Sequence, residues 1–166
     1  MKALIQRVTA AKVTVDEELV SAIGKGICVL VGFCKTDTEK DVDYITRKIL
    51  SIRLFHDETG KRWKKSVKDE NLEILCVSQF TLYGRLKKNK PDFNLSMEGE
   101  RANELYSTFL KKLGTQYDSN KIKDGRFGAY MQVHIQNDGP VTIEIESPTL
   151  NDKQNELPND SDHNQL

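Results

Sequence analysis

Hydrophobic and polar positions in the first thirty residues of this chain follow the pattern of short strands. Apolar runs at residues 3–8, 12–15 and 26–32 are separated by turn signals at residues 16–18 and 24–26. The run from Ile27 to Val31 is continuous, which is typical of a strand that is buried on both faces. The N-terminal part is therefore predicted to form neighbouring strands of one sheet.

Two later segments place apolar residues at helical spacing. After Thr38, which together with Asp41 resembles a capping box, Val42, Ile45 and Ile49 recur at helical spacing. A longer pattern runs from about residue 98 to residue 113, and Gly114 is expected to end it as a left-handed cap. Its apolar stripe, which is predicted to face the core, consists of Ala102, Leu105, Tyr106, Phe109, Leu110 and Leu113.

The remaining pattern predicts further strands and a tail. Residues 53–55 read as a short strand, and residues 72–77 as a buried strand that ends at Ser78. Residues 130–136 and 141–146 alternate on either side of Gly139-Pro140, so they are predicted to form a closing hairpin, with His134 on its polar face. Residues 149–166 are polar and poor in apolar side chains, which predicts a disordered tail after a domain of residues 1–148.

Composition changes this picture little. The chain has 166 residues, 37% of them hydrophobic and 30% charged, which suits one domain. No apolar run approaches the roughly 18 residues of a membrane span, and the N-terminus lacks a secretory signal, so a cytoplasmic location is expected. Cys28, Cys34 and Cys76 are predicted to be free thiols, and the histidines are too scattered for a zinc site. We expect no metal and no cofactor.

Charge is distributed less evenly than the formal net charge of zero suggests. The tail after residue 150 is acidic, so the preceding part is weakly basic. The basic residues gather in two clusters, at residues 61–65 and residues 85–90. Each cluster could meet nucleic-acid phosphates, or could simply be a solvated surface.

The segment from Ser78 to Thr81 is the first candidate for chemistry. A buried strand that stops and then presents Ser, Gln, Phe and Thr offers two hydroxyls, an amide and main-chain N–H groups in one place. Such groups can bind an ester carbonyl, although they can also satisfy loop backbone. Neither His56 nor His134 is placed by the sequence to activate a hydroxyl nucleophile, so a Ser-His-Asp triad has no support.

The Gly139-Pro140 pair is the second candidate. A peptide bond before proline keeps a trans preference of only about 0.5–1 kcal/mol, so a tight connection can hold it cis. The two carbonyl groups could then point the same way as a wall made of main chain. The alternative is an ordinary hairpin turn.

Together the Ser-Gln-Phe-Thr segment at residues 78–81 and the Asn-Asp-Gly-Pro-Val-Thr segment at residues 137–142 resemble the two signature motifs of D-aminoacyl-tRNA deacylases. The likeness extends over nearly all of residues 1–148, including residues 1–8, 24–32, 48–54 and 125–131. The chain differs from the bacterial pattern at Trp63-Lys64, at residues 90–93 and at Tyr130, which looks like eukaryotic-type variation.

The resemblance implies a homodimer of an α/β domain with three layers (β/β/α), mostly antiparallel sheets and two main helices. It implies hydrolysis of the ester that joins a D-amino acid to tRNA, with rejection of the L form and some cleavage of glycyl-tRNA. Gly139-Pro140, held cis, would enter the pocket of the partner subunit and collide with an L side chain. The residues to which the resemblance assigns catalysis or substrate binding are Ser78, Gln79, Phe80, Thr81, Ala102, Phe127, Met131, Gly139 and Pro140.

Roles within this set differ. Main-chain N–H groups near Phe80 and Thr81 would stabilise the oxyanion, and Gln79 would orient the ester. Either Thr81 is the nucleophile, or water attacks with help from the 2′-hydroxyl of the tRNA. Two other functions stay open: a nucleic-acid-binding module without catalysis, including a secondary contact with DNA, and a hydrolase that acts on another acyl ester.

Overall fold

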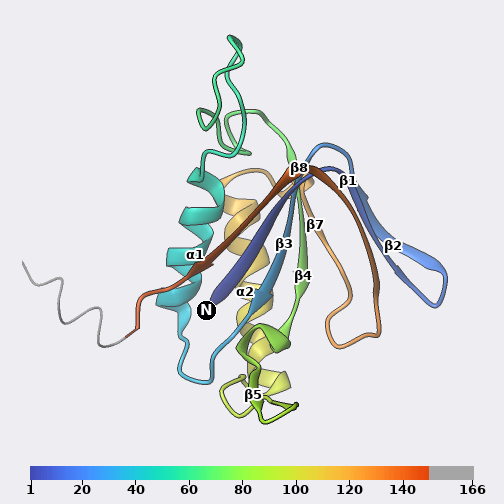
Figure 1. Ribbon diagram of the computed structural model, residues 1–166, viewed down its shortest axis with the longest axis vertical. Coiled ribbons are helices and arrows are strands. Elements are labelled where there is room, and N and C mark those ends of the chain that lie inside the picture. The colour runs from blue at the N-terminus through green and yellow to red at the C-terminus, as the bar shows by residue number, and fades with distance from the viewer. Residues whose placement is uncertain (150–166) are drawn as a thin grey trace, which may run out of the picture.

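Strand β1 (Lys2–Val15) is the common partner of three other strands in this computed structural model, which describes residues 1–149 (Figure 1). Along one edge its first half pairs with β3 (Gly26–Gly32) and its second half pairs with β2 (Glu18–Ile23). The other edge pairs with β8 (Gln132–Glu146), and all three pairings are antiparallel. The predicted strands at residues 3–8 and 12–15 are thus one uninterrupted strand.

The sheet continues beyond β3 with parallel pairing. Strand β3 is parallel to β4 (Glu73–Ser78), which is in turn parallel to β7 (Ile122–Asp124). Helix α1 (Glu39–Ser51) leads from β3 toward β4, and helix α2 (Gly99–Gln116) leads toward β7. Both helices lie on the same side of the sheet (Figure 1). This arrangement confirms the predicted mixed α/β fold with a sheet and two main helices.

Strands β3 and β4 are buried on both faces because hydrophobic clusters lie on either side of them. Ile27, Val29 and Val31 of β3 face the helices, in a cluster with Ile45 and Phe109. The side chains between them point the other way. They pack with residues from β1, β2 and β8 in a second cluster, formed by Val8, Ala11, Val13, Ile23, Cys28, Leu75 and Val77. The continuous apolar run of the sequence is explained by this double burial.

Both helices form where the apolar periodicity predicts them, although α2 ends later than expected. Thr38 is the N-cap of α1, and its backbone N–H donates to the Asp41 carboxylate at 2.9 Å. The predicted left-handed cap at Gly114 is wrong, because α2 continues through this residue to Gln116. The predicted strand at residues 53–55 is also wrong, since only Phe55 forms an isolated bridge, with Lys65.

The predicted closing hairpin is instead a single strand with a bulge. On one side of Gly139-Pro140, Thr142 pairs with Gln6 of β1; on the other side, Asn137 pairs with Val8 of the same strand. The chain therefore does not reverse, and residues 138–141 leave the ladder. Alternation alone could not distinguish the two arrangements, because it reports which face a residue occupies and not which strand it pairs with.

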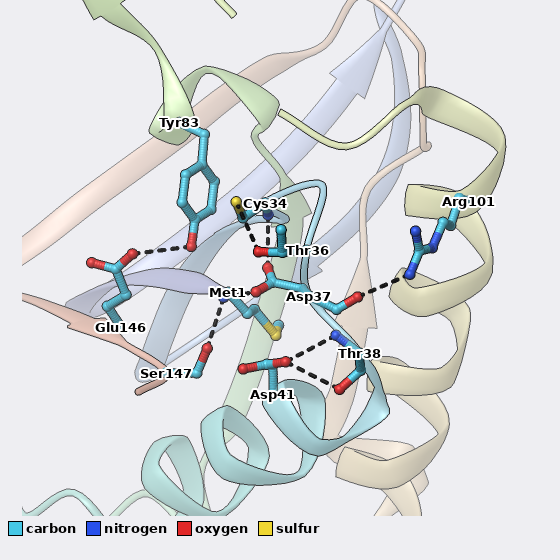
Figure 2. Close-up of polar contacts among 10 residues, drawn as sticks. All are labelled: Met1, Cys34, Thr36, Asp37, Thr38, Asp41, Tyr83, Arg101, Glu146 and Ser147. Carbon is cyan, nitrogen blue, oxygen red and sulfur yellow. Dashed lines mark hydrogen bonds and ion pairs between the residues drawn. The ribbon is translucent and has the colours of Figure 1, made fainter. Parts of the chain in front are cut away.

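A polar network ties the start of β1 to the loop before α1 and to the end of β8 (Figure 2). The Met1 amino group is fully buried, 2.6 Å from an Asp37 carboxylate oxygen and 2.8 Å from the Ser147 hydroxyl oxygen. Burial raises the pKa of Asp37, and the hydrogen bond and charge of the adjacent ammonium group oppose this shift without reversing it. Nearby, the Tyr83 hydroxyl donates to Glu146 at 3.2 Å.

Two further expectations concern surface and tail. Among residues 1–149, no helix is long and apolar enough to cross a membrane. Cys28 and Cys76 are buried free thiols and Cys34 is half-buried, while His134 is exposed as predicted. Apart from Thr149, the predicted tail lies outside the described residues.

Candidate functional site

A cavity of about 530 Å³ opens where β4 ends, beside the start of α2 and the segment before β8. Its volume lies in the range of small-molecule sites. Its lining contains six of the nine residues singled out from the sequence: Ser78, Gln79, Phe80, Ala102, Phe127 and Met131. These residues lie up to 53 positions apart in the chain, so the fold brings them together.

The end of the β3–β4 ladder fixes the first wall of this cavity. Ser78 is the last residue of β4 and lies opposite Val31 of β3. The next backbone N–H, that of Gln79, donates to the Val31 carbonyl at 2.6 Å. Gly32 lies close beneath, because a Cβ atom there would be 2.8 Å from the Gln79 carbonyl oxygen. The position of Gln79 is therefore set by buried main chain.

The 3-10 turn η1 (Phe80–Tyr83) follows directly and exposes main-chain donors. Phe80 and Thr81 are its first two residues, so no earlier carbonyl of the turn accepts from their N–H groups. Within residues 1–149 the backbone N–H groups of these two residues have no hydrogen-bond acceptor. Buried Tyr83 anchors the other end of the turn (Figure 2). Two free N–H donors thus lie at the edge of the cavity.

Thr81 lies beside the cavity and does not line it. Its hydroxyl oxygen accepts a hydrogen bond of 2.5 Å from the Gln79 side-chain amide. Among the described residues, no histidine, carboxylate or lysine side chain is hydrogen-bonded to this hydroxyl. The hydrogen bond that the Thr81 hydroxyl makes here is therefore to an amide, which cannot remove its proton.

The opposite wall is held by contacts to α2. The Phe127 ring lies against the Tyr106 ring, with 5.6 Å between centroids, and the Tyr106 hydroxyl donates to Asp124. Burial raises the pKa of both Tyr106 and Asp124. The Met131 sulfur packs so closely on Gly125 that a Cβ atom there would lie only 2.7 Å away. The aromatic and sulfur groups of this wall are thereby held in place.

The chemistry of the lining is unusual for a hydrolytic site. Of the described residues that line the cavity, none is Asp, Glu, His, Cys, Lys or Arg. The polar side chains are those of Ser78, Gln79 and Tyr130, and Tyr130 is 88% exposed. Such a site can hold and orient a substrate and can donate hydrogen bonds. It does not supply a general base from its own side chains.

Gly139 and Pro140 do not line this cavity in the same chain. Both are exposed in the β8 bulge, and the peptide bond between them is cis, as the resemblance implied. In Figure 1 the middle of β8 lies in the upper half of the view, near its label, whereas β5 (Arg85–Lys87), which follows η1, lies at the bottom. Within one subunit, the segment at residues 137–142 therefore lies apart from the segment at residues 78–81.

Arg7 was not identified from the sequence, yet it holds the bulge in place. Its guanidinium group is nearly buried and lies 3.3 Å from the Asp138 carboxylate. It also donates to the Asp138 carbonyl at 3.2 Å and to the Leu54 carbonyl at 2.6 Å. A signal was present, because Ala3, Ile5 and Arg7 occupy alternate positions on one face of β1, and an arginine on an apolar face needs buried partners.

A larger cavity, of about 770 Å³, lies elsewhere, around Met1, Asp37, Tyr83 and Glu146. None of the nine predicted residues lines it. Its carboxylates Asp37, Asp41 and Glu146 are engaged in the network of Figure 2, and Glu39 pairs with Lys112. Size alone therefore does not identify the site, and we assign the smaller cavity as the candidate.

Comparison with known proteins gives consistent similarities. A profile of the family described as D-Tyr-tRNA(Tyr) deacylase matches residues 4–146. A D-aminoacyl-tRNA deacylase from Drosophila melanogaster is 68% identical over 157 residues, which is 95% of this chain and 99% of that protein. D-aminoacyl-tRNA deacylase 1 from Homo sapiens is 62% identical, over 89% of this chain and 71% of that protein.

Solved structures agree in fold. The structure of a protein named c-Myc DNA Unwinding Element Binding Protein has a TM-score of 0.88 and 61% identity, covering 90% of this chain and 100% of that one. A probable eukaryotic D-amino acid tRNA deacylase has a TM-score of 0.75 over 87% of this chain and 98% of that one. At 17% identity, the second likeness concerns the fold alone.

The close approach at Gly32 predicts a sensitive position. Gly32→Ala should lower the free energy of unfolding by about 1–3 kcal/mol, because the new methyl group meets the Gln79 carbonyl and the Leu82 side chain. Gly24→Ala is the matched control, since its methyl group has only a Glu73 oxygen within 4 Å, at 3.9 Å. Urea denaturation of both variants measures the difference. Equal midpoints would show that the ladder end does not constrain Gln79.

Proposed function

The chain belongs to the D-Tyr-tRNA(Tyr) deacylase family and is a D-aminoacyl-tRNA deacylase, a hydrolase of ester bonds, and we propose how its cavity performs this reaction. The substrate is an amino acid esterified to the terminal adenosine of tRNA. The products are the free D-amino acid and the tRNA. The reaction removes D-amino acids from tRNA and leaves L-aminoacyl-tRNA intact.

One observation carries the proposed mechanism: the described lining of the cavity combines apolar walls with free main-chain N–H groups nearby and contains no side chain of Asp, Glu, His, Cys, Lys or Arg. An ester carbonyl that enters this cavity meets donors but no base. The chemistry is therefore assigned to positioning and to stabilisation of negative charge.

In the proposed reaction, water attacks the ester carbonyl while the 2′-hydroxyl of the terminal ribose assists from within the substrate. The N–H groups of Phe80 and Thr81 donate to the oxygen that becomes negatively charged. Gln79 orients the ester, and its bond to Thr81 fixes its own amide. The C–O bond to the ribose then breaks, and the ribose oxygen takes up the proton that the attacking water gives up, relayed through the 2′-hydroxyl.

Discrimination between mirror-image substrates is proposed to rest on exclusion. If the amino and carbonyl groups are both held, exchanging L for D swaps the side chain with the hydrogen atom on the α-carbon. Rejection by 10⁴ requires about 5.5 kcal/mol, which a clash with fixed main chain supplies more readily than an attractive pocket. We assign this main chain to Gly139-Pro140.

Because Gly139 and Pro140 lie outside the cavity of their own chain, we propose that they enter the cavity of a second copy in a homodimer. Their exposure and the support of the bulge by Arg7 are consistent with this role. A two-fold dimer would then contain two sites, each built from both subunits.

A nucleic-acid-binding module without catalysis is not favoured. Relatives that are 46–68% identical, from Saccharomyces cerevisiae to Drosophila melanogaster, are named as deacylases. The basic clusters suit a tRNA substrate equally well. The DNA binding for which one related solved structure is named is a statement about that protein.

The function predicts a graded response to three substrates under one assay. The protein should hydrolyse D-tyrosyl-tRNA, cleave glycyl-tRNA more slowly, and leave L-tyrosyl-tRNA about 10⁴-fold less affected than the D form. Glycine is cleaved because it has no side chain to exclude. Equal rates on the D and L esters would contradict exclusion, and a simple acyl ester hydrolysed as fast as D-tyrosyl-tRNA would favour a different hydrolase.

The mechanism predicts that loss of the Thr81 hydroxyl changes the rate little, whereas loss of the 2′-hydroxyl of the tRNA lowers it strongly. Thr81→Ala should retain activity within about tenfold, because the Thr81 hydroxyl acts only through Gln79 and the backbone N–H of residue 81 is kept. A substrate that ends in 2′-deoxyadenosine should be cleaved at least about 10²-fold more slowly. Single-turnover rates measure both, with Thr81→Ser as the control that keeps the hydroxyl. Complete loss in Thr81→Ala alone, restored in Thr81→Ser, would instead make Thr81 the nucleophile.

The cross-subunit site predicts complementation. Ala102→Phe should fill the cavity, and Gly139→Ala should disturb the bulge, because its φ is +118° and the methyl group would lie 3.1 Å from Arg7. Each variant alone should be inactive. Refolded mixtures should recover about a quarter of wild-type activity, since half of the dimers then carry one intact site. A monomeric protein, or confirmed heterodimers without recovery, would refute the shared site.

A further inference from the structure

The hairpin formed by β5 and β6 (Lys90–Asp92) carries a dense group of cations beside the cavity. Arg85, Lys87, Lys88 and Lys90 are all exposed, and Asp92 is the one carboxylate of the two strands and their turn. Within the described part of the chain, none of the four cations belongs to an ion pair. Their charge is not neutralised by the fold.

The second basic cluster, at residues 61–65, differs from the hairpin in two ways: it has a nearby ion pair, and it lies away from the cavity. Its Lys65 forms an ion pair of 3.1 Å with Glu58, and Asp57 lies in the same loop, with its pKa lowered by hydrogen bonds from Thr59 and Lys61 and by the charge of Lys64. This loop between α1 and β4 lies at the top of Figure 1, whereas β5 lies at the bottom. Of these two basic clusters, the hairpin is therefore the one that lies beside the cavity within a subunit.

The root of the hairpin is joined to the cavity rim by direct contacts. The Gly84 N–H donates to the Thr81 carbonyl at 2.8 Å. The Phe93 ring meets the Phe80 ring edge-on, with 5.0 Å between centroids. Ser96 then donates to the Phe80 carbonyl at 3.0 Å. The hairpin thus leaves and rejoins the chain at the residues that bound the site.

The turn of the hairpin places a lysine in a backbone conformation that this residue type rarely adopts. Lys88 has a φ of +58°, in the left-handed region that favours Gly or Asn in two-residue turns. A lysine there gains nothing from packing, because it is exposed. Backbone strain at an exposed charged residue is a reason to look for a ligand. Leu86, 79% exposed, adds an apolar contact to the same hairpin.

We propose that this hairpin binds the phosphates of the single-stranded 3′ end of the aminoacyl-tRNA whose terminal adenosine occupies the adjacent cavity. The proposal rests on the deacylase function. From Arg85 to Lys87, strand β5 extends about 7 Å, at roughly 3.4 Å per residue. This length matches about two phosphate-to-phosphate steps of a stacked strand, at roughly 3.4 Å per step. Lysine and arginine side chains supply the charge for such contacts, and the exposed Leu86 can contact a base or ribose.

The test replaces all four cations: Arg85→Gln, Lys87→Gln, Lys88→Gln and Lys90→Gln in one variant. The kcat/KM for D-tyrosyl-tRNA should fall by about tenfold or more at low salt. The slope of log kcat/KM against log salt concentration should become less steep by about 2–3, because each lost phosphate contact on a single strand removes roughly 0.7. On the D-tyrosyl ester of adenosine, which has no phosphates, both proteins should be equally active.

The matched control removes the same charge from the helices through Lys40→Gln, Arg47→Gln, Lys48→Gln and Lys111→Gln, all at exposed positions. It should keep the wild-type salt slope, and thermal unfolding should show that both variants are folded. An unchanged slope in the hairpin variant, or an equal change in the control, would overturn the proposal. So would loss of duplex DNA binding with tRNA cleavage unaffected. A wild-type protein inactive on D-tyrosyl-tRNA would instead refute the deacylase function itself.

Discussion

The candidate site depends on the parallel pairing of β3 with β4, buried on both faces and ended by a glycine and a serine. Because hydrophobic clusters cover both sides of these strands, their ends cannot shift without disturbing the core. The Gln79 N–H bond to Val31 extends this order by one residue past the strand. The position of the following turn, η1, is therefore fixed by the packing of the core.

A site without its own acid or base places unusual demands on geometry. The cavity offers N–H donors, one amide side chain and apolar walls, and the proposed reaction takes its proton acceptor from the substrate. Positioning can lower a barrier substantially, but only where the groups are held within a fraction of an ångström. The contacts of Gln79 with Thr81, and of Tyr106 with Phe127 and Asp124, provide such restraint.

Sequence reasoning predicted the helices and the buried strands, because periodicity and burial are local properties of the chain. The motifs and the family resemblance named six of the residues that line the cavity. Sequence reasoning failed where pairing partners decide the structure. The segment around Gly139 was predicted to be a hairpin, yet both of its halves pair with β1. One failure was of another kind, at a helix end: Gly114 was predicted to end α2, yet the helix continues to Gln116. Arg7 was missed because its partners, Asp138 and Leu54, are far away in sequence.

The free N–H groups of Phe80 and Thr81 have a consequence for how such a site can be dissected. Truncating a side chain leaves the backbone donor in place, so an alanine scan would rank these positions as unimportant even if they carry the charge stabilisation. Chemical synthesis that exchanges one amide for an ester linkage would delete a single donor and leave every side chain intact. The contribution of backbone N–H groups to catalysis can be measured by this amide-to-ester replacement.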